Sequence, residues 1–259
     1  MKIAILGAAG RMGQNLLRCA AKIEGCEIVA AVERDGHPCL GAAVPGMGGL
    51  CYTADWPARA EAVIDFTFHE CVTTNFANAV ANRQAIVLGT TGLDAAERQC
   101  VTEAAAKIPV VWAANMSLGV NLLLELVKRA AAVLGQDYDI EIVEAHHRLK
   151  KDAPSGTALS LAEAAAAGRG VALRDVACYG REGIVGERPK GEIGLHAVRG
   201  GSIVGEHTVS FIADEETVEV THKAASREAF ATGALRAALW LNGRAPGLYT
   251  MRHVLGFAD

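Results

Sequence analysis

The first 115 residues alternate short apolar runs with segments of helical periodicity. Five runs rich in Ala, Val, Ile and Leu have the length and composition of buried strands. These predicted strands cover residues 2–6, 27–32, 62–67, 85–89 and 109–114, and the helices predicted between them cover residues 11–24, 70–83 and 94–107. Continuous apolar strands separated by helices are typical of a parallel sheet that is covered on both faces. The pattern therefore predicts a doubly wound α/β domain.

The pattern changes after Asn115. The sequence predicts an amphipathic helix over 119–134, a strand over 138–147, and a helix from the N-cap Ser155 to about residue 167. Residues 168–192 hold six glycines and many charged residues, which favours a long loop.

Three strand patterns with short links follow the loop, at residues 194–198, 205–213 and 216–222, and a turn at 214–216 joins the last two. Sequential strands without helices between them indicate an antiparallel or mixed sheet, and so a second, smaller α+β domain. A last helix is predicted over 227–243. Its expected apolar side consists of Phe230, Leu235, Leu239 and Trp240.

Composition and charge narrow the classes of function. Hydrophobic residues make up 51% of the 259 residues, which is enough for a sizeable core. A net charge of -4 provides no general basic field for nucleic acid, and no apolar run approaches the roughly 18 residues of a membrane span. The seven cysteines are odd in number and form no CxxC pair, so we expect thiols in a reducing cytoplasm.

A glycine motif directly follows the first predicted strand. Gly7, Gly10 and Gly13 have the spacing G-x-x-G-x-x-G before a predicted helix, which suits close approach of the backbone to a pyrophosphate at the helix N-terminus. Glu33 lies at the end of the second strand, where a carboxylate binds the ribose hydroxyls of NAD. Arg34 follows it and could bind the 2′-phosphate of NADP. These signals predict a Rossmann-like dinucleotide-binding domain.

Two further segments follow predicted strands, namely Gly89–Thr90–Thr91 and residues 113–117. Ligands of doubly wound sheets bind beyond the carboxyl ends of the strands. Both segments are therefore expected beside the nicotinamide, on the same rim as Gly7 and Glu33.

A dense polar stretch, EAHHRLKKDAPSGTAL, covers residues 144–159. His146 and His147 end a predicted strand and are followed by cations, including Lys150. The turn then leads into a helix whose first amides have no partner within the helix, so the stretch can hold a small carboxylate or phosphate. Paired histidines without i, i+4 spacing or further ligands do not indicate zinc, and no metal site is expected. A histidine here is available for proton transfer.

Residue chemistry alone leads to an NAD(P)-dependent reductase or dehydrogenase that acts on a small carboxylate. Two alternatives remain open at this point. One is another NAD(P)-dependent dehydrogenase of small amino or carboxylic acids, and the other is a non-catalytic NAD(P)-sensing protein.

The motifs themselves carry a resemblance that runs nearly end to end. They are GAAGRMG, Glu33-Arg34, DFT, GTTG, NMSLGVN, EAHHRLKKDAPSGTAL, IVGEHTV, THKAASR and ALWLNGRAPGLYTMRHVL. On these motifs the chain resembles the bacterial 4-hydroxy-tetrahydrodipicolinate (dihydrodipicolinate) reductases of lysine and diaminopimelate biosynthesis. The resemblance implies a cyclic dicarboxylate substrate, NADH or NADPH as cofactor, and a cytoplasmic homotetramer that joins through the sheets of the second domain.

The resemblance also implies roles for individual residues. His146 would donate and accept the proton, with Lys150 as a second proton-donor candidate, and the substrate would be held by His147, Lys150, Gly156 and Thr157. The cofactor would be surrounded by Gly7, Ala8, Ala9, Gly10, Arg11, Met12, Glu33, Arg34, Gly89, Thr90, Thr91, Ala113, Ala114, Asn115 and Met116.

The domain boundaries follow from the same resemblance. Residues 1–117 and 227–259 would form the dinucleotide-binding domain, and residues 118–226 the substrate-binding and oligomerisation domain. One departure is Phe68 after DFT, where some relatives carry a polar or basic residue near the cofactor phosphate, which puts a strong NADP preference in doubt.

Overall fold

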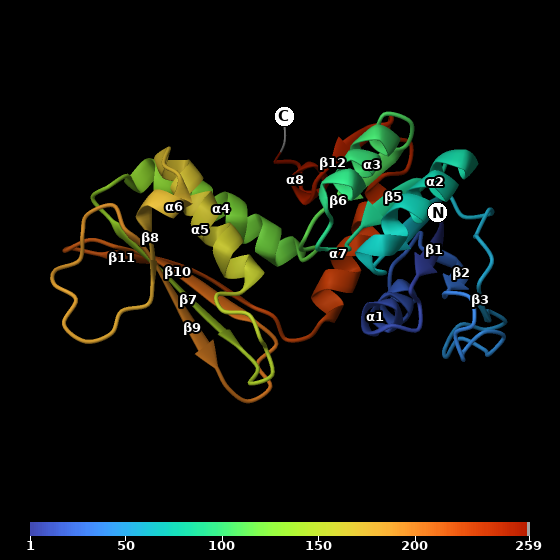
Figure 1. Cartoon of the computed structure of the whole chain (residues 1–259), viewed down its shortest axis with the longest axis horizontal. Helices are drawn as coiled ribbons and strands as arrows, with labels where there is room; N and C mark the ends of the chain where they lie inside the picture. The colour runs from blue at the N-terminus through green and yellow to red at the C-terminus, as the bar shows by residue number, and fades with distance from the viewer. Residues whose placement is uncertain (258–259) are drawn as a thin grey trace. The chain divides into compact units, whose positions relative to one another are not determined.

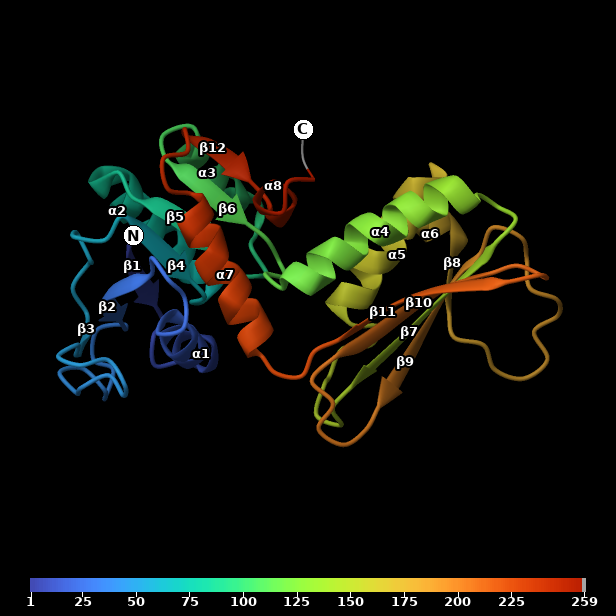
Figure 2. The same ribbon diagram turned by 180° about the vertical axis from the view of Figure 1, so that it is seen from behind.

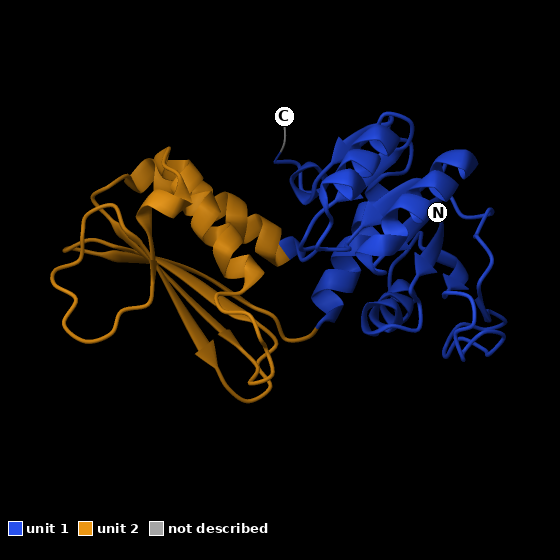
Figure 3. Cartoon of the chain, in the orientation of Figure 1, with its two compact units in different colours: residues 1–118, 227–259 blue, residues 119–226 orange. Residues whose placement is uncertain are grey.

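The chain forms two compact units in a computed structural model that describes residues 1–257. One unit consists of Met1–Leu118 and the segment from Arg227 onward, and the other is Gly119–Ser226 (Figure 3). Within residues 1–257, no helix has the length and apolar character needed to cross a membrane.

The first unit contains a seven-stranded sheet in which every pairing is parallel. Its strands are β1 (Lys2–Leu6), β2 (Glu27–Val32), β3 (Tyr52–Thr53), β4 (Ala62–Asp65), β5 (Ala85–Leu88), β6 (Pro109–Trp112) and β12 (Gly247–Tyr249). The spatial order is β12-β6-β5-β4-β1-β2-β3. Six of these strands have the doubly wound order 3-2-1-4-5-6, and the order reverses between β1 and β4. The predicted doubly wound domain is therefore confirmed.

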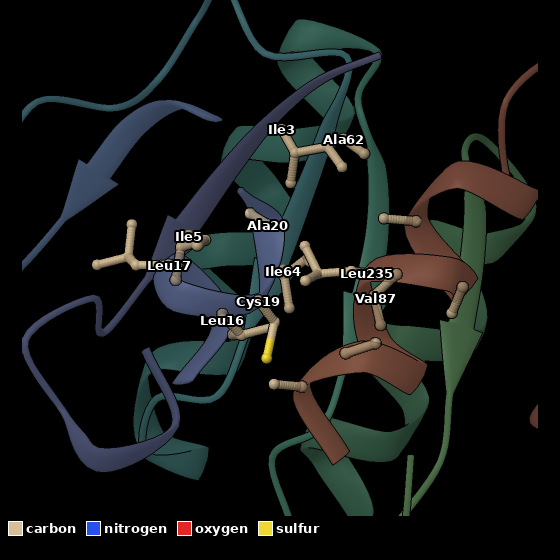
Figure 4. Close-up of a cluster of buried hydrophobic side chains, with 14 of the residues drawn as sticks. Ile3, Ile5, Leu16, Leu17, Cys19, Ala20, Ala62, Ile64, Val87 and Leu235 are labelled. Atoms are coloured by element: carbon tan, nitrogen blue, oxygen red, sulfur yellow. The ribbon is translucent and has the colours of Figure 1, made fainter. Parts of the chain in front are cut away.

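Helices cover both faces of this sheet (Figures 1 and 2). They are α1 (Arg11–Ala20), α2 (Val72–Asn82), α3 (Ala95–Ala105), α7 (Glu228–Trp240) and the short α8 (Met251–Val254), with a 3-10 turn at His69–Cys71. On one face, α1 and α7 pack on inward residues such as Ile5 and Ile64 (Figure 4). On the other face, α2 and α3 pack on residues such as Leu6 and Ile86. The β-branched runs of the sequence thus form the middle layer of a three-layer sandwich.

The predicted apolar side of α7 was only partly right, because Leu235 is fully buried but the other three predicted residues are not. Its buried positions are Gly233, Leu235 and four alanines, Ala231, Ala234, Ala237 and Ala238. The bulky residues Phe230, Leu239 and Trp240 are only partly buried. The physical reason is close packing, because a Cβ at Gly233 would lie 1.8 Å from the carbonyl oxygen of Met116. Small residues allow α7 to approach the loop after β6.

The second unit contains a mixed five-stranded sheet. Its strands are β7 (Asp139–His146), β8 (Ala177–Tyr179), β9 (Ile193–Arg199), β10 (Glu206–Ile212) and β11 (Thr217–Lys223), in the order β11-β10-β7-β9-β8. β10 is antiparallel to both of its neighbours, whereas β7, β9 and β8 run parallel. The predicted mixed sheet is confirmed.

One face of this sheet, the inner face, is covered by α4 (Leu118–Leu134) and α5 (Gly156–Arg169), which lie side by side in both views (Figures 1 and 2). A Cβ at Gly168 would lie 2.3 Å from the Lys128 carbonyl oxygen, so this glycine lets the two helices approach closely. The opposite, outer face carries partly exposed apolar residues of three strands, Val143, Val198 and Ile212.

The predicted loop over 168–192 was only partly right. α5 continues to Arg169, a short helix α6 spans Leu173–Val176, and β8 follows at Ala177–Tyr179. Only the rest of the segment is a loop, and Arg188 ties it to the outer face through Asp139 and Glu141. α6 and β8 have only four and three residues, so they carry no periodic signal in the sequence.

Candidate functional site

The loop between β1 and α1 has the geometry that its glycines predict. Gly7 adopts a φ of +68°, which disfavours other residues. A Cβ at Gly13 would lie 2.3 Å from the Gly7 carbonyl oxygen, so only glycine allows α1 to pack against the loop. α1 begins after Gly10 with no side-chain cap. Its first amides are therefore available to an anion.

Glu33 lies against this loop. It follows β2, and its Oε1 accepts a hydrogen bond of 2.8 Å from the backbone N–H of Ala9. Arg34, the next residue, is exposed. The structure therefore brings together the glycine loop and the predicted Glu33-Arg34 pair, although they are more than twenty residues apart.

The loops after β4 and β5 are joined by a buried carboxylate. Asp65 is fully buried, and its side chain accepts hydrogen bonds from the amide and hydroxyl of Thr67 and from Asn75. The hydroxyl of Thr90 lies 3.2 Å from the Thr67 carbonyl oxygen. Asp65 stood in the motif DFT without an assigned role. Its burial, which the sequence did not reveal, makes it a support for both loops.

The segments after β5 and β6 share one hollow of about 330 Å³. Its lining consists of Thr90, Thr91, Gly92, Leu93, Arg98, Trp112, Ala113 and Ala114. The sequence predicted four of these residues but not Arg98 or Trp112, which carry no recognisable motif. Among the other candidates, the side chains of Ala8 and Met116 are buried in the core. Only their backbone atoms could face a ligand.

In the second unit, the predicted histidine stretch begins at the end of β7. His146 is the last residue of the strand and is 8% exposed, on the inner face. Glu144, two residues earlier, points to the same face because side chains alternate along a strand. His146 Nδ1 lies 2.5 Å from Glu144 Oε2. His147 comes after the strand and begins the following loop.

Glu144 is the centre of this cluster. Arg199, aligned with His146 on the neighbouring strand β9, donates to both carboxylate oxygens at 2.7 and 2.8 Å. The backbone N–H of Ser155 donates to Oε1 at 3.0 Å. Burial alone would raise the pKa of Glu144, but the hydrogen bonds from Arg199, His146 and Ser155 outweigh it and lower the pKa below its usual range. Glu144 is therefore a buried carboxylate ion.

His207 on β10 completes the buried cluster. Its ring contacts the His146 ring edge to face, with centroids 5.2 Å apart, and its Nε2 lies 3.1 Å from Ser155 Oγ. Burial, aided by His146, lowers the pKa of His207 to about 4, so this ring is neutral at pH 7. Ser155 Oγ also accepts from the Ala158 amide, which confirms Ser155 as the N-cap of α5.

The remaining candidates lie around the start of α5. The ammonium group of Lys150 is 2.9 Å from Asp152, whose carbonyl oxygen accepts a hydrogen bond from Arg199. Gly156 is the first residue of α5 and is exposed, and Thr157 follows it. The stretch therefore combines a lysine, a histidine cluster and helix amides within one unit. In residues 1–257, no group of three or more His, Cys, Asp or Glu side chains is arranged to hold a metal ion.

Sequence reasoning missed Glu144, Arg199 and His207 as members of this site. Arg199 and His207 lie more than fifty residues after Glu144 and reach it through strand pairing. The available signal was that the quoted motifs EAHHRLKKDAPSGTAL and IVGEHTV contain Glu144 and His207, to which no role had been given.

Together, the doubly wound sheet with its glycine loop and the mixed sheet with its histidine cluster define a two-domain, nucleotide-dependent oxidoreductase. Family models described as dihydrodipicolinate reductase, N-terminus, and dihydrodipicolinate reductase, C-terminus, match residues 1–116 and 119–255. The chain therefore belongs to the dihydrodipicolinate reductase family.

Individual relatives agree. A 4-hydroxy-tetrahydrodipicolinate reductase of Ruegeria pomeroyi is 51% identical and covers 98% of this chain and 97% of its own. One of Anaeromyxobacter dehalogenans is 47% identical with the same coverage. Among solved structures, a dipicolinate-bound dihydrodipicolinate reductase from Paenisporosarcina sp. TG-14 has a TM-score of 0.78 and 23% identity, covering 96% of this chain and 97% of that one. At this identity the structural match shows the fold alone.

Proposed function

We propose that this chain reduces 4-hydroxy-tetrahydrodipicolinate to tetrahydrodipicolinate in lysine and diaminopimelate biosynthesis. The observation that carries the proposal is identity of 47–51% to reductases of that name over almost the whole chain, including both units. In the balanced reaction, substrate, NAD(P)H and a proton yield tetrahydrodipicolinate, NAD(P)⁺ and water.

The residues of the first unit fit a dinucleotide. Gly7 and Gly13 keep the loop open to a pyrophosphate, the first amides of α1 are uncapped, and Glu33 is held beside them. The cofactor contacts that we propose are Gly7–Met12, Glu33, Arg34, Gly89–Thr91 and Ala113–Met116. When bound, the reduced nicotinamide supplies a hydride to C4 of the conjugated ring.

His146 is proposed to exchange the proton. The C4 hydroxyl first leaves as water together with a hydrogen of the neighbouring carbon, which gives the conjugated ring. Hydride addition at C4 then leaves an enamine, and protonation of that neighbouring carbon completes the reduction. The ring of His146 is nearly buried in a polar cluster, which suits a general acid and base. Lys150 is the second proton-donor candidate, since it follows His146 by only four residues and its side chain is partly shielded from solvent.

The substrate carboxylates are proposed to be held by His147, Lys150, Gly156 and Thr157. Gly156 supports this assignment, because the fold does not require glycine there. Its φ is not positive, and an added Cβ would meet no described atom within 4 Å. A glycine at the first position of α5 instead leaves the helix amides open to a carboxylate.

The test is consumption of NADH and of NADPH with freshly generated 4-hydroxy-tetrahydrodipicolinate, with the product identified. Pyridine-2,6-dicarboxylate should inhibit competitively against the substrate. An enzyme that oxidises neither nucleotide with this substrate, or reduces another carboxylate far better, would refute the proposal. Millimolar dicarboxylate without effect would refute the substrate-site assignment only.

Use of both nucleotides is proposed from the Glu33-Arg34 pair. A carboxylate favours free ribose hydroxyls, whereas an exposed guanidinium attracts a 2′-phosphate. Arg34→Ala should raise KM for NADPH about tenfold or more over its effect on NADH, from roughly 1.5–3 kcal/mol for a charged hydrogen bond. Arg18→Ala, at an exposed position on α1, is the control. Equal effects of Arg34→Ala on the two nucleotides would contradict its proposed role.

The assembly is proposed to be a cytoplasmic homotetramer that joins through the outer sheet face of the second unit. The support is the set of partly exposed apolar residues on that face, Val143, Val198 and Ile212. Light scattering of wild type and of Val198→Glu tests this, and an unchanged mass for the variant would place the interface elsewhere.

A further inference from the structure

The buried carboxylate of Glu144 has a geometry that selects one form of the neighbouring histidine. A carboxylate ion only accepts hydrogen bonds, so the nitrogen of His146 that contacts it must carry a hydrogen. That nitrogen is Nδ1, at 2.5 Å from Oε2. In the neutral ring, Nε2 is then the unprotonated nitrogen. Resting on the function proposed above, we propose that Glu144 is a positioning residue that makes Nε2 of His146 the atom that exchanges the proton with substrate.

The carboxylate is itself held in place. Arg199 on β9 donates to both of its oxygens, and the backbone amide of Ser155, the N-cap of α5, donates to Oε1. The side chain of Glu144 is fully buried. If it rotated away from His146 it would lose these hydrogen bonds, and no water could replace them. Arg199 thus orients Glu144, and Glu144 orients His146. A buried acid that binds the Nδ1–H of a histidine sets its tautomer and stabilises the imidazolium.

A second observation points to Nε2 independently. Gly205, just before β10, lies beside the His146 ring. A Cβ there would be 3.0 Å from Nε2 and 3.4 Å from Cδ2. The φ of Gly205 is not positive, so its backbone conformation does not require glycine. The missing side chain therefore leaves the space around Nε2 open, which explains the glycine in the motif IVGEHTV.

The other charged and titratable groups around His146 do not compete for Nδ1. His207 is neutral at pH 7 and turned edge to face, with its Nε2 on Ser155. His222 lies beyond it on β11, aligned with His207, and burial lowers its pKa as well. Lys150 is paired with Asp152. Among these groups, Glu144 is the carboxylate that contacts His146, so the cluster carries one short acid–histidine pair.

The first test reads the tautomer without any reaction. In the full-length protein labelled with ¹⁵N-histidine, the ring nitrogens of His146, assigned with His146→Gln, should show a protonated Nδ1 and an unprotonated Nε2 above pH 7. Glu144→Gln should give a mixture of tautomers. An Nε2–H tautomer in the wild type, or an unchanged Nδ1–H tautomer in Glu144→Gln, would overturn the proposal. Neither result depends on which substrate the enzyme reduces.

The second test uses kinetics. Glu144→Gln should lower kcat about tenfold or more, a part of the roughly 10²–10⁴-fold that a placed acid–base group contributes, while KM for NADH changes less than about twofold. The acidic limb of the kcat profile should also move along the pH axis. A purely structural Glu144 would instead lower the melting temperature, with kcat per folded molecule and the pH profile unchanged, and that outcome refutes the proposal.

A pair of glycine variants keeps the proposal testable if Glu144→Gln does not fold. Gly205→Ala should displace the ring of His146 by a few tenths of an ångström and lower kcat several-fold. Gly200→Ala adds the same methyl where no described atom lies within 4 Å and φ is not positive, so its kcat should equal that of wild type. Equal kcat values for the two variants would refute the role of the open Nε2. Absence of activity in the wild type would refute the proposed function and leave the tautomer result standing.

Discussion

Two Glu–His–Arg clusters lie on opposite faces of β7. Glu144 on the inner face binds His146 and Arg199, and Glu141 on the outer face binds His196 together with Arg181 and Arg188. Each cluster also contains a glycine, which lies beside the glutamate in the outer cluster and beside the histidine in the inner cluster. A Cβ at Gly194 would be 1.9 Å from Glu141 Oε2, as one at Gly205 would crowd the His146 ring.

The clusters differ in which ring nitrogen of the histidine contacts the glutamate and which one is left free. His196 turns Nε2 to its glutamate, at 2.6 Å, and shares that carboxylate with two arginines of the loop after β8. His146 turns Nδ1 to its glutamate and leaves Nε2 beside a glycine. Only the inner cluster adjoins the start of α5 and Lys150. A glutamate, a histidine and an arginine thus occur together on both faces. The free ring nitrogen beside the proposed anion site makes the inner cluster the candidate for catalysis.

The sharpest test of this comparison replaces the two histidines in turn. His146→Gln should lower kcat by about 10²-fold or more, because it removes the acid–base group. His196→Gln removes the matching ring of the outer cluster and should leave kcat within about twofold. Steady-state kinetics with saturating NADH decide. Equal losses in both variants would mean that the two clusters do not differ in function.

The second-largest expected effect concerns Lys150, the cation beside the inner cluster. Lys150→Ala should raise the substrate KM and the inhibition constant for pyridine-2,6-dicarboxylate about tenfold or more, since a charged hydrogen bond contributes roughly 1.5–3 kcal/mol. Lys151→Ala, at the exposed neighbouring position, should change both by much less. If the two variants bind the dicarboxylate alike, the charge of Lys150 is not directed at the substrate.

The outer cluster should act on stability rather than on rate. Burial would raise the pKa of Glu141, but Arg181, Arg188 and His196 outweigh it and lower the pKa to about 2. A lowered carboxyl pKa contributes stability above the unfolded value of 4.5, and this contribution is lost as pH falls toward 2. Glu141→Gln should therefore cost about 1–3 kcal/mol at pH 7 and flatten the acid dependence below pH 4.5.

Urea unfolding at several pH values measures this effect. Glu219→Gln, an exposed glutamate of β11 on the same sheet, is the control. A Glu141→Gln protein as stable as the control at pH 7, or one that is fully stable but lacks activity, would assign the outer cluster a different role.

The smallest expected effect concerns His207. Its pKa of about 4 lies below the unfolded value near 6.5, so the unfolded chain binds a proton first as pH falls. Stability should therefore decrease between about pH 6.5 and pH 4, a window above that of Glu141. His207→Gln should remove about 1–2 kcal/mol of this decrease. The slope against pH is the readout, and an unchanged slope would show that folding does not lower the pKa of His207.

The sequence predicted the parallel sheet well because its buried strands are continuous apolar runs. It did not predict β3, β8 and β12, which have two or three residues each and no alternation. It also placed four large residues of α7 inward, whereas the helix fully buries only Leu235 among them, together with alanines and Gly233. Periodicity shows which face is apolar but not how closely an element approaches its neighbour.

The candidate site likewise contains residues that the sequence revealed and residues that only the structure revealed. Residues adjacent in sequence, such as His146 and Lys150, could be found as one motif. Arg199 and His207 could not, because they reach Glu144 through the pairing of β7 with β9 and β10, and the register of a mixed sheet is not visible in one chain. The clash that would follow a side chain at position 205 likewise exists only in three dimensions.

The spacing of Glu141 and Glu144 has a consequence for how this chain can change over evolutionary time. Three residues is an odd step along a strand, so the two carboxylates point to opposite faces. Deleting or inserting a single residue between them would bring both to one face, leaving one set of cations without its acid and crowding two anions on the other side. In this family we therefore expect the length of β7 to vary less than its composition, with shifts of register removed by selection.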